Sequence, residues 1–279
     1  MNITIIGLGL MGGSMAIDLR KRNFAKKIFG VDSDILHAET AKNIGLVDEI
    51  VDLETGINSA DLIILATPVD ATINMLPNIM NKIDSQIITD VCSTKYKICE
   101  LIKEHPKRKN FVASHPMAGT EYSGPWAAIS HLYDGKSTII CNKEESSNIA
   151  IKVVEDLYGA LNMRIIHMDA KSHDVHAAYV SHISHISSFA LALTVLEKEK
   201  DEKHIFNMAG GGFRSTVRLA KSSSDMWTPI FNQNSENIID VLDTYISKLQ
   251  EFKERISNNS KEEINTMILD ANKIKRIIS

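Results

Sequence analysis

Apolar positions in the first part of the chain come in short blocks, separated by longer segments that suit helices. Such blocks predict strands at Ile3–Ile6, Ile28–Val31, Leu62–Leu65, Ile87–Asp90, Phe111–Ser114, Thr138–Cys141 and Arg164–His167. The intervening segments predict helices, for example at Asp34–Asn43, Ala71–Asn81, Lys95–Glu104 and Asn148–Tyr158. This alternation is typical of a doubly wound parallel α/β sheet, in which ligands bind beyond the carboxyl ends of the strands.

The pattern changes near Met168. One helical pattern runs from Ala170 to Lys200 without proline or glycine, and further helices are predicted at 213–222, 226–257 and 261–278. We therefore expect a Rossmann domain at residues 1–168 and an all-helical domain at 169–279. Long apolar helices rarely cover one another fully in so small a domain, which predicts a homodimer through the helical domain. A monomer whose helices pack on the first domain is the alternative.

A glycine-rich turn follows the first predicted strand. Gly7 permits a tight turn into a helix, Gly9 lets a pyrophosphate approach the backbone, and Gly12 permits close packing of the helix on the strand. Free N–H groups at the start of the helix would bind the phosphates. The second strand leads to Asp32, about 20 positions after Gly12. An acid there accepts hydrogen bonds from the adenosine ribose and repels a 2′-phosphate, which favours NAD over NADP.

The predicted cofactor site also includes Thr67 and Pro68, which follow the strand Leu62–Leu65. In related folds the loop at this place passes near the nicotinamide ribose. The predicted cofactor-binding residues are Gly7, Leu8, Gly9, Leu10, Met11, Gly12, Asp32, Thr67 and Pro68. The alternative is a glycine-rich turn in an α/β protein of another kind.

Composition narrows the function classes. The 279 residues are 44% hydrophobic and 24% charged with a net charge of −4, which is ordinary for a soluble globular protein and unlike a basic nucleic-acid binder. The longest apolar run, from Ile3 to Ile17, is too short to span a membrane. Three cysteines without C-x-x-C spacing fit a reducing cytoplasm. We therefore expect a cytoplasmic protein that binds neither nucleic acid nor membrane.

Further motifs follow in order along the chain. They are Ala41-x-x-x-Gly45-x-x-Asp48-Glu49, Asp90-Val-Cys-Ser93-Thr-Lys95, Ser114-His115-Pro116-Met-Ala-Gly119-Thr-Glu121, the run from His173 to His185, and Gly210-Gly-Gly-Phe-Arg-Ser-Thr-Val-Arg218-Leu-Ala. Together they resemble the prephenate dehydrogenase family, which includes arogenate and cyclohexadienyl dehydrogenases. The resemblance covers essentially the whole chain, and its His-Pro-Met-Ala-Gly and Gly-Gly-Gly-Phe elements are specific in combination.

The resemblance implies NAD-dependent oxidative decarboxylation of prephenate to 4-hydroxyphenylpyruvate, a reaction of tyrosine biosynthesis. This chemistry needs a proton acceptor at the ring hydroxyl, and His115 lies at a predicted strand end beside the expected nicotinamide site. The family serine that matches Ser93 hydrogen-bonds to this centre. We expect His115 and Ser93 to be catalytic, with a helix N-cap before 94–104 as the alternative role of Ser93.

Prephenate is a dianion, so its site must hold two carboxylates. Arg218 is the expected anchor, because a guanidinium binds a carboxylate through two parallel hydrogen bonds. Arg214, four residues earlier on the same predicted helix face, is a second candidate. Family members often have an acid where this chain has Ser215, which leaves Glu121 as a partner for either arginine.

Four histidines lie in the long helical segment. His182 and His185 share one face, whereas ideal helical geometry places His173 and His176 on roughly the opposite face. The resemblance implies that His185 contacts substrate, that His173 and His182 support it, and that His176 is structural. The predicted substrate-binding residues are therefore Arg218, His185, His182, Arg214 and Glu121. No metal site is expected, because H-E-x-x-H is absent from the sequence and hydride chemistry needs no metal.

Three other functions stay open. A β-hydroxyacid dehydrogenase would have a catalytic lysine on the long central helix, and no lysine occurs between Lys171 and Lys198. A non-catalytic NAD-binding sensor would not need Ser93, His115 and Arg218 together. Arogenate differs from prephenate only by an amino group in place of a keto group, so the sequence does not separate these two substrates.

Overall fold

The computed structural model describes residues 1–201 and 204–277. Two compact units divide the chain, residues 1–234 and 235–279. The helices that follow the sheet up to residue 233 thus belong to the same unit as the sheet. These units are defined by contacts within the fold and do not test the predicted domain boundary between residues 168 and 169, which stays a prediction.

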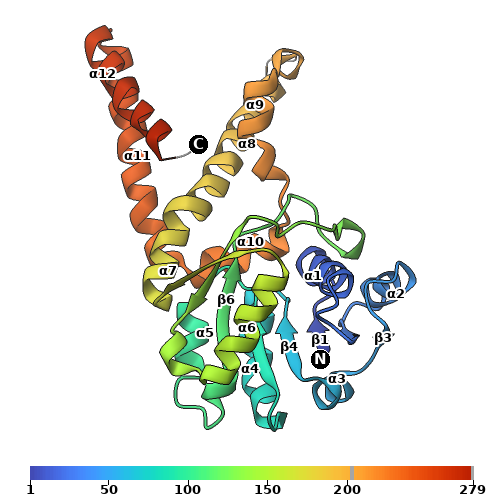
Figure 1. The fold of residues 1–279 in the computed structure, drawn as a ribbon. Helices are drawn as coiled ribbons and strands as arrows, with labels where there is room; N and C mark the ends of the chain where they lie inside the picture. Colours follow the sequence, from blue (N-terminus) through green and yellow to red (C-terminus); the bar gives the residue numbers. More distant parts are fainter. Residues whose placement is uncertain (202–203, 278–279) are drawn as a thin grey trace. The chain divides into compact units, whose positions relative to one another are not determined.

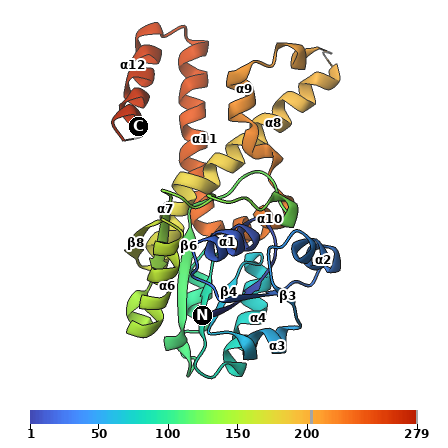
Figure 2. The ribbon, with the colours of Figure 1, turned by 45° about the vertical axis from the view of Figure 1, so that its right-hand side comes forward.

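Within the described ranges of the first unit, eight strands form one sheet (Figures 1 and 2). The strands are β1 (Asn2–Ile6), β2 (Lys27–Val31), β3 (Glu49–Ile50), β4 (Leu62–Leu65), β5 (Ile87–Asp90), β6 (Phe111–Pro116), β7 (Ser137–Cys141) and β8 (Arg164–Met168), in the order β3-β2-β1-β4-β5-β6-β7-β8. The first six strands are parallel, and β7 pairs antiparallel with β6. The order reverses between β1 and β4, which is where doubly wound sheets bind ligands.

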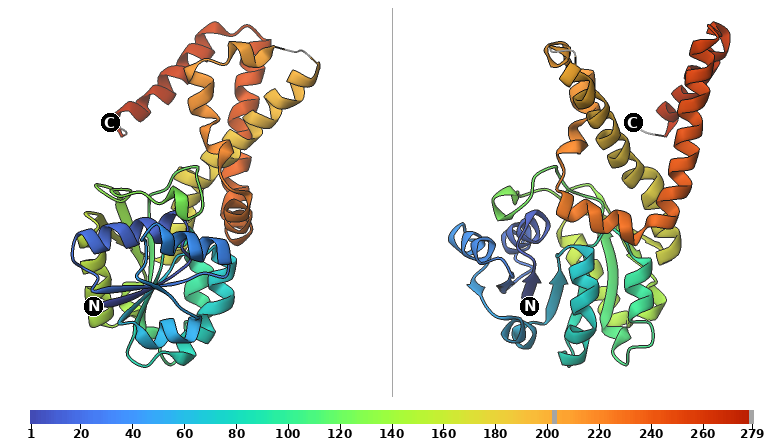
Figure 3. Two further views of the ribbon diagram at one scale, coloured as in Figure 1. Left: turned by 90° about the vertical axis from the view of Figure 1, so that its right-hand side faces the viewer. Right: turned by 180° about the vertical axis from the view of Figure 1, so that it is seen from behind.

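The helices that connect these strands cover both faces of the sheet, as the left panel of Figure 3 shows, and further helices follow β8 along the chain. They are α1 (Leu10–Lys21), α2 (Ile35–Asn43), α3 (Leu53–Ser59), α4 (Val69–Lys82), α5 (Tyr96–Leu101), α6 (Asn148–Ala160), α7 (Ala170–Ala177), α8 (Ile183–Asp201), α9 (Gly211–Thr216) and α10 (Ser224–Gln233). Short 3-10 turns include η2 (Pro125–Ala127) and η6 (Arg218–Lys221).

Alternate residues of the central strands enter two separate cores. Leu62 and Ile64 of β4 face a core that includes side chains of α1 and α6, whereas Ile63 and Leu65 face a core that includes α4, α5 and α10. All four side chains are fully buried, which explains why the strand is a continuous apolar block rather than an alternating one. The doubly wound α/β fold is thereby confirmed, and the seven predicted strands agree with the observed strands within two residues.

Two features of the sheet differ from the prediction. The strand β3 was not predicted, because two residues, Glu49 and Ile50, leave no hydrophobic pattern to detect. The strands β7 and β8 pair parallel with each other but run opposite to the rest of the sheet. The direction of β7 depends on the path of the connection after His115, a long loop of residues 117–136. A pattern of apolar residues gives no information about strand direction.

The predicted helix from Ala170 to Lys200 is present, with a five-residue π-helical turn at Ala178–His182 between α7 and α8. By length and composition alone this helix could cross a membrane, and only 11% of its apolar window is buried. The exposed apolar side chains of α8 include Leu193 and Leu196.

The second unit contains α11 (Ser235–Ser257) and α12 (Lys261–Ala271), followed by the 3-10 turn η7 (Asn272–Arg276). Arg255 forms an ion pair of 2.6 Å with Glu263 between the two helices. The predicted continuous helix at 226–257 is wrong, because Asn234 leaves helical conformation (φ −114°, ψ 28°) and separates α10 from α11. The predicted helix 261–278 changes to a 3-10 turn after Ala271, and its last residue lies outside the described residues.

Candidate active site

The glycine turn has the geometry that a dinucleotide requires. Gly7 has φ +97°, and a Cβ there would lie 2.6 Å from the carbonyl oxygen of Ala66 in the loop after β4. A Cβ on Gly12 would lie 2.1 Å from the carbonyl oxygen of Gly7. By contrast, no described heavy atom outside its immediate chain neighbours lies within 4 Å of a Cβ built on Gly9. The space above Gly9 therefore lets a phosphate approach the backbone, while the other two glycines allow the turn to form.

The acid after β2 is fixed to this turn. Oδ2 of Asp32 accepts a hydrogen bond of 2.8 Å from the backbone N–H of Leu8, and Oδ1 accepts one of 2.9 Å from that of Asp34. The side chains of Leu8 and Leu10 are buried in the core, so these two predicted cofactor residues contribute backbone only. The N-cap of α1, Gly9, has no side-chain capping bond, which leaves the first N–H groups of α1 for an anion.

Thr67 and Pro68 lie across the crevice from the glycine turn. A Cβ on Gly7 would lie 3.0 Å from Cγ2 of Thr67, which places the two loops in contact. Oγ1 of Thr67 is 2.8 Å from Oγ1 of Thr72, and Pro68 is the N-cap of α4. On the other side of Asp32 lies a pocket, which is lined by Asp32, Ile35, Ala38, Glu39, Lys42, Asn43 and Ile50.

His115 is the penultimate residue of β6 and is buried. Its Nδ1 is 2.8 Å from Nε2 of His173, and Nδ1 of His173 is 2.8 Å from Oδ1 of Asp174. Burial lowers the pKa of His115 well below 6.5, and the neighbouring His173 and the charge of Lys95 lower it further. The imidazole of His115 is therefore neutral near pH 7, as a proton acceptor must be.

A buried ion pair supports the strand end at His115. Nζ of Lys95 binds Oδ2 of Asp90 and donates a hydrogen bond of 2.8 Å to the carbonyl oxygen of Ser114. Both charged side chains are fully buried. Because burial of an unpaired charge is costly, Lys95 and Asp90 bind each other and lock β5, β6 and the start of α5 together.

Ser93 lies half-buried in the loop between β5 and α5. Its side chain has no hydrogen-bond partner among the described residues, and α5 begins only at Tyr96 with Lys95 at the N-cap position. The alternative role of Ser93 as a helix cap is therefore wrong. The carboxylate of Asp174 accepts hydrogen bonds from the first N–H groups of α5 instead.

His182 and His185 both contact the indole of Trp227 in α10. The ring of His185 stacks on it at 3.5 Å between centroids, and His182 meets it edge-on at 5.9 Å. His182 is fully buried, its Nδ1 is 3.2 Å from Nδ2 of Asn234, and its Nε2 has no partner among the described residues. Burial lowers the pKa of His182 to about 4, so this imidazole is neutral and its Nε2–H is a hydrogen-bond donor.

The π-helical turn changes which histidines share a face. Ideal geometry predicts that His173 and His182 face opposite directions, but both are buried, and His182 lies close enough to His115 to lower its pKa. A π turn advances by a smaller angle per residue than an α turn, so it rotates His182 back toward His173. His176, predicted to share a face with His173, is exposed.

Arg218 forms an ion pair of 2.9 Å with Glu121, in the loop that follows His115. The charge of Arg218 also lowers the pKa of His185, after the larger effect of burial. Arg214 is exposed, and its Nε donates to the carbonyl oxygen of Ala209. The expected shared helix face of the two arginines is wrong, because α9 ends at Thr216 and Arg218 begins a 3-10 turn.

The loop 117–136 is bound to α1 near its far end. Oγ of Ser14 accepts a hydrogen bond from the backbone N–H of Ile129, and the buried carboxylate of Asp18 accepts one of 2.6 Å from Oγ of Ser130 and one from the N–H of His131. In Figures 1 and 2 this green loop leaves the sheet and passes over α1. The helix that begins at the glycine turn thus holds the loop that contains Glu121.

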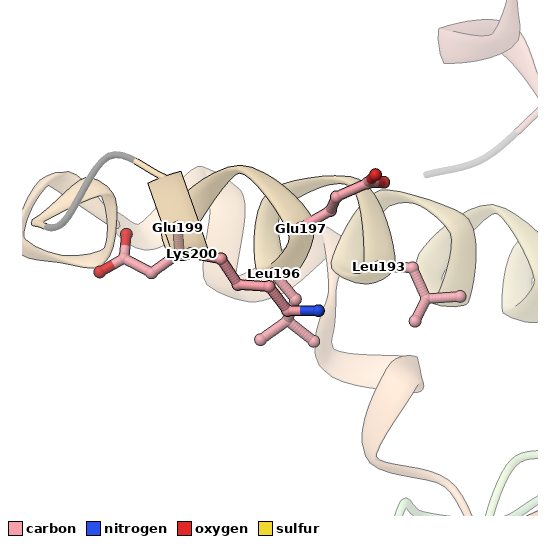
Figure 4. A pocket seen from close by; sticks show the side chains of 5 residues that line it. All are labelled: Leu193, Leu196, Glu197, Glu199 and Lys200. Atoms are coloured by element: carbon pink, nitrogen blue, oxygen red, sulfur yellow. The ribbon is translucent and has the colours of Figure 1, made fainter.

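Sequence reasoning gave no role to Asp174, Trp227 or Asn234. Asp174 stands beside His173 in a quoted motif, but its partners are 78 and 79 positions away. The sequence signal for Trp227 was its rarity, because the chain has only two tryptophans. A surface depression on α8 contains none of the predicted site residues and is lined by Leu193, Leu196, Glu197, Glu199 and Lys200 (Figure 4). Among the described residues, no group of three or more His, Cys, Asp or Glu side chains could hold a metal ion.

Comparisons with known proteins agree with this geometry. Residues 15–167 match the sequence model of the prephenate dehydrogenase nucleotide-binding domain, and residues 169–269 match that of the prephenate dehydrogenase dimerization domain. The prephenate dehydrogenase of Bacillus subtilis is 31% identical over 94% of this chain and 72% of its own length.

Solved structures give the same result. A prephenate dehydrogenase of Aquifex aeolicus, crystallised with hydroxyphenyl propionate and NAD+, is 31% identical with a TM-score of 0.86 over 99% of this chain and 97% of its own. An arogenate dehydrogenase of Synechocystis is 25% identical with a TM-score of 0.78 and full coverage of both chains. A buried neutral histidine at a strand end, a dinucleotide turn, and family matches over both halves lead to one conclusion: the chain belongs to the prephenate dehydrogenase family.

Proposed function

We propose that this protein oxidises and decarboxylates prephenate to 4-hydroxyphenylpyruvate with NAD+. The observation that supports this most directly is the neutral imidazole of His115, buried at the carboxyl end of β6 and hydrogen-bonded to His173. The Aquifex relative, which binds NAD+ and a hydroxyphenyl ligand, has the same fold over nearly the whole chain. The reaction places the protein in aromatic amino acid biosynthesis.

The nucleotide fits the residues at the switch point of the sheet. NAD+, when bound, supplies the acceptor for the hydride that leaves the ring carbon. The N–H groups at the start of α1 would bind its pyrophosphate, and the open space at Gly9 admits it. Asp32 would accept hydrogen bonds from the ribose hydroxyls, since each of its oxygens accepts only one bond from the residues that the structure describes.

His115 has two tasks on the ring hydroxyl of the substrate. It accepts the hydroxyl proton as hydride loss makes this oxygen electron-poor, and it returns a proton when the ring becomes a phenol. The second step is required by balance: prephenate and NAD+ give 4-hydroxyphenylpyruvate, carbon dioxide and NADH with no net proton released. Ser93, whose hydroxyl is unpaired among the described residues, is proposed as the second hydrogen-bonding group at this oxygen.

The opposite end of the site would hold the carboxylates. Arg218 is proposed as the anchor, with Glu121 holding its guanidinium toward the loop after His115. His185 stacks on the indole of Trp227, and His182 offers a buried N–H that has no partner among the described residues. The Nε2–H of His182 can donate to a carboxylate without adding a charge that would trap the carboxylate that must leave as carbon dioxide. The Nδ1–H of His185 already donates to the carbonyl oxygen of Ser181.

We propose assembly as a homodimer through the helical region. Residues 169–269 match a dimerization domain, and α8 exposes Leu193 and Leu196 to solvent. A second copy of the chain that covers this face would explain why the helix is long and apolar enough to cross a membrane although we expect none around it. We place the protein in the cytoplasm, in keeping with biosynthetic relatives and unpaired cysteines.

The deciding experiment measures NADH absorbance after protein, NAD+ and prephenate are mixed. We expect the signal to grow with release of an equal amount of carbon dioxide. A hydroxy acid in place of prephenate serves as the control for a β-hydroxyacid dehydrogenase. Tight NAD+ binding without turnover on any of these substrates would overturn the proposal in favour of a nucleotide sensor.

Arogenate is the second candidate substrate, favoured by the full-length likeness to the Synechocystis arogenate dehydrogenase. Its amino group adds a positive charge near the side-chain carboxylate. Kinetics with both substrates under the same conditions will decide, because the preferred one has the larger kcat/KM.

A further inference from the structure

Asp174, in α7, contacts both segments that contain the proposed catalytic side chains. It binds His173, the partner of His115, and it also binds the start of α5, two residues after Ser93. We propose that Asp174 and His173 are positioning residues that fix the tautomer and orientation of His115 and, through α5, the place of Ser93. This inference rests on the proposed function, because it assigns the groups that prepare its base.

The contact with α5 is made by main-chain donors. Oδ1 of Asp174 accepts a hydrogen bond of 2.7 Å from the N–H of Lys95, and Oδ2 accepts one of 2.9 Å from the N–H of Tyr96. An anion is favoured at the start of a helix, where N–H groups lack intrahelical partners. Asp174 therefore serves as a cap supplied by another helix, and it sets where the loop with Ser93 ends.

The contact with His173 determines a proton arrangement. A carboxylate only accepts hydrogen bonds, so Nδ1 of His173 must donate to Asp174. With His173 neutral, its Nε2 has a lone pair and accepts from Nδ1–H of His115 at 2.8 Å. With Nδ1 protonated, the neutral ring of His115 has its lone pair on Nε2. That nitrogen is the one remaining to accept a proton from the substrate.

The surrounding charges favour this arrangement. The charged and titratable groups near His115 come from β5, α5, α7 and the π turn, and they are Asp90, Lys95, His173, Asp174 and His182. Lys95 and Asp90 form an ion pair with each other. The carboxylate of Asp174 is therefore the anion at the end of the hydrogen-bonded chain that runs from His115 through His173. When Nε2 of His115 takes a proton, the positive charge is stabilised through His173 by this anion.

Asp174 is itself held from a second direction. Nδ2 of Asn234 donates a hydrogen bond of 2.7 Å to the backbone carbonyl of Asp174 and lies 3.2 Å from Nδ1 of His182. The carboxylate accepts three N–H bonds, which offsets the cost of its burial. A group so fully bonded, whose links to the proposed site run through His173, α5 and the amide of Asn234, suits a positioning role.

The first test replaces Asp174 by Asn and uses Asp169→Asn as the matched control. The side chain of Asp169 caps the same helix, α7, by accepting from the N–H of Ser172, and the contact of Asp169 with His173 is made by its backbone carbonyl, which the substitution keeps. We expect Asp174→Asn to lower kcat by about tenfold or more with little change in the KM of prephenate. The acidic limb of its kcat/KM profile should move to lower pH, since loss of the anion disfavours protonated His115. A role confined to folding would leave the limb in place, which would overturn the inference.

Two variants at His173 separate orientation from charge, also where Asp174→Asn fails to fold. His173→Gln keeps an acceptor for Nδ1–H of His115, and His173→Leu removes it. Both leave the bond between Asp174 and α5 possible. We expect Gln to restore a substantial part of the kcat that Leu loses. Equal kcat in the two variants would contradict the role of His173 in orienting His115.

The second test does not depend on turnover. Nitrogen-15 NMR of histidine-labelled protein without ligands reports which ring nitrogen of each histidine carries the proton. We expect His115 to be protonated on Nδ1 in the native chain and in His173→Gln, and to lose this preference in His173→Leu. Protonation of His115 on Nε2 in the native chain would overturn the inference even if prephenate is oxidised. The expected tautomer without any turnover would overturn only the proposed function.

Discussion

The chemistry of the site comes from a few side chains whose surroundings fix their protonation. His115 and His182 are buried without an acid in direct contact, and burial is the main cause of the lowered pKa of each. Arg218, by contrast, is half-exposed and paired with Glu121. The site therefore combines neutral imidazoles with one accessible cation, which suits a substrate that has a hydroxyl at one end and carboxylates at the other.

Replacement of His115 by Asn should lower kcat by about 10²- to 10⁴-fold, the usual contribution of a general base. Affinity for NAD+, measured by fluorescence titration, should change little. In the native protein a base with a lowered pKa stays deprotonated as the pH falls, so kcat/KM should remain flat from about pH 8 to about 6.5 and decline only below. A parallel loss of NAD+ affinity in the variant would show a structural role instead.

Replacement of Arg218 by Ala should raise the KM of prephenate by about 10- to 100-fold, since a hydrogen bond to a charged group contributes about 1.5–3 kcal/mol. Steady-state kinetics of Arg214→Ala provide the comparison, because Arg214 lies four positions away and bonds to the carbonyl of Ala209. We expect a clearly smaller effect there. If the two variants behave alike, Arg218 is not the specific anchor.

Replacement of Asp32 by Ser should raise kcat/KM with NADP+ relative to NAD+ by about tenfold, an effect of about 1.4 kcal/mol, because it removes the anion that repels a 2′-phosphate. Asp34→Ser, which alters the cap of α2 two residues later, is the control. An unchanged cofactor ratio in Asp32→Ser would mean that another group sets the preference.

At the scale of elements, hydrophobic patterning predicts what lies in the core and misses what is set by distant contacts. Seven strands and most helices follow from blocks of apolar residues, because burial in the two cores requires them. The break at Asn234 does not follow, since its amide bonds to Asp174 and His182, which lie 60 and 52 positions away. The π turn that brings His173 and His182 together is likewise invisible to ideal helical periodicity.

The same limit applies to the site. The pattern predicts Gly7, Asp32 and His115 because each follows a strand, and strand ends meet at one edge of a parallel sheet. It leaves open which arginine pairs with Glu121, a contact 97 positions apart in the sequence that the fold alone decides.

The hydrogen bonds between α1 and the loop 117–136 can be tested by mutation. Asp18→Asn should weaken the bonds to Ser130 and to the N–H of His131, which together contribute about 1–3 kcal/mol. Limited proteolysis should then cut this loop faster, and the KM of prephenate should rise because Glu121 is less well placed. Lys136→Gln, whose exposed side chain lies at the other end of the same loop, should do neither. Unaltered cleavage in Asp18→Asn would show that other contacts hold the loop.

At the scale of the whole molecule, each of the two units exposes apolar side chains that a monomer leaves in water. Leu193 and Leu196 lie on α8 of the first unit, and Ile246, Leu249 and Leu269 lie on the helices of the second. Both groups fall within the range that matches a dimerization domain. Such exposure supports the proposed homodimer.

Sedimentation velocity provides the test of assembly. We expect the native chain to sediment as a dimer and Leu193→Glu to shift it toward monomer, because a buried carboxylate without a partner is costly in an interface. Ile149→Glu, on the exposed face of α6 away from the matched dimerization range, should leave the dimer intact. A native monomer across the concentration series would contradict the proposed assembly.

The bond between Asp174 and α5 has a consequence for how this sequence tolerates mutation. The donors at positions 95 and 96 are backbone N–H groups, which every amino acid except proline possesses. Tyr96, whose ring is exposed, can therefore be replaced by many other residues while the contact persists. Mutation is therefore narrowly constrained at the acceptor, Asp174. At the donor, position 96, only proline is excluded.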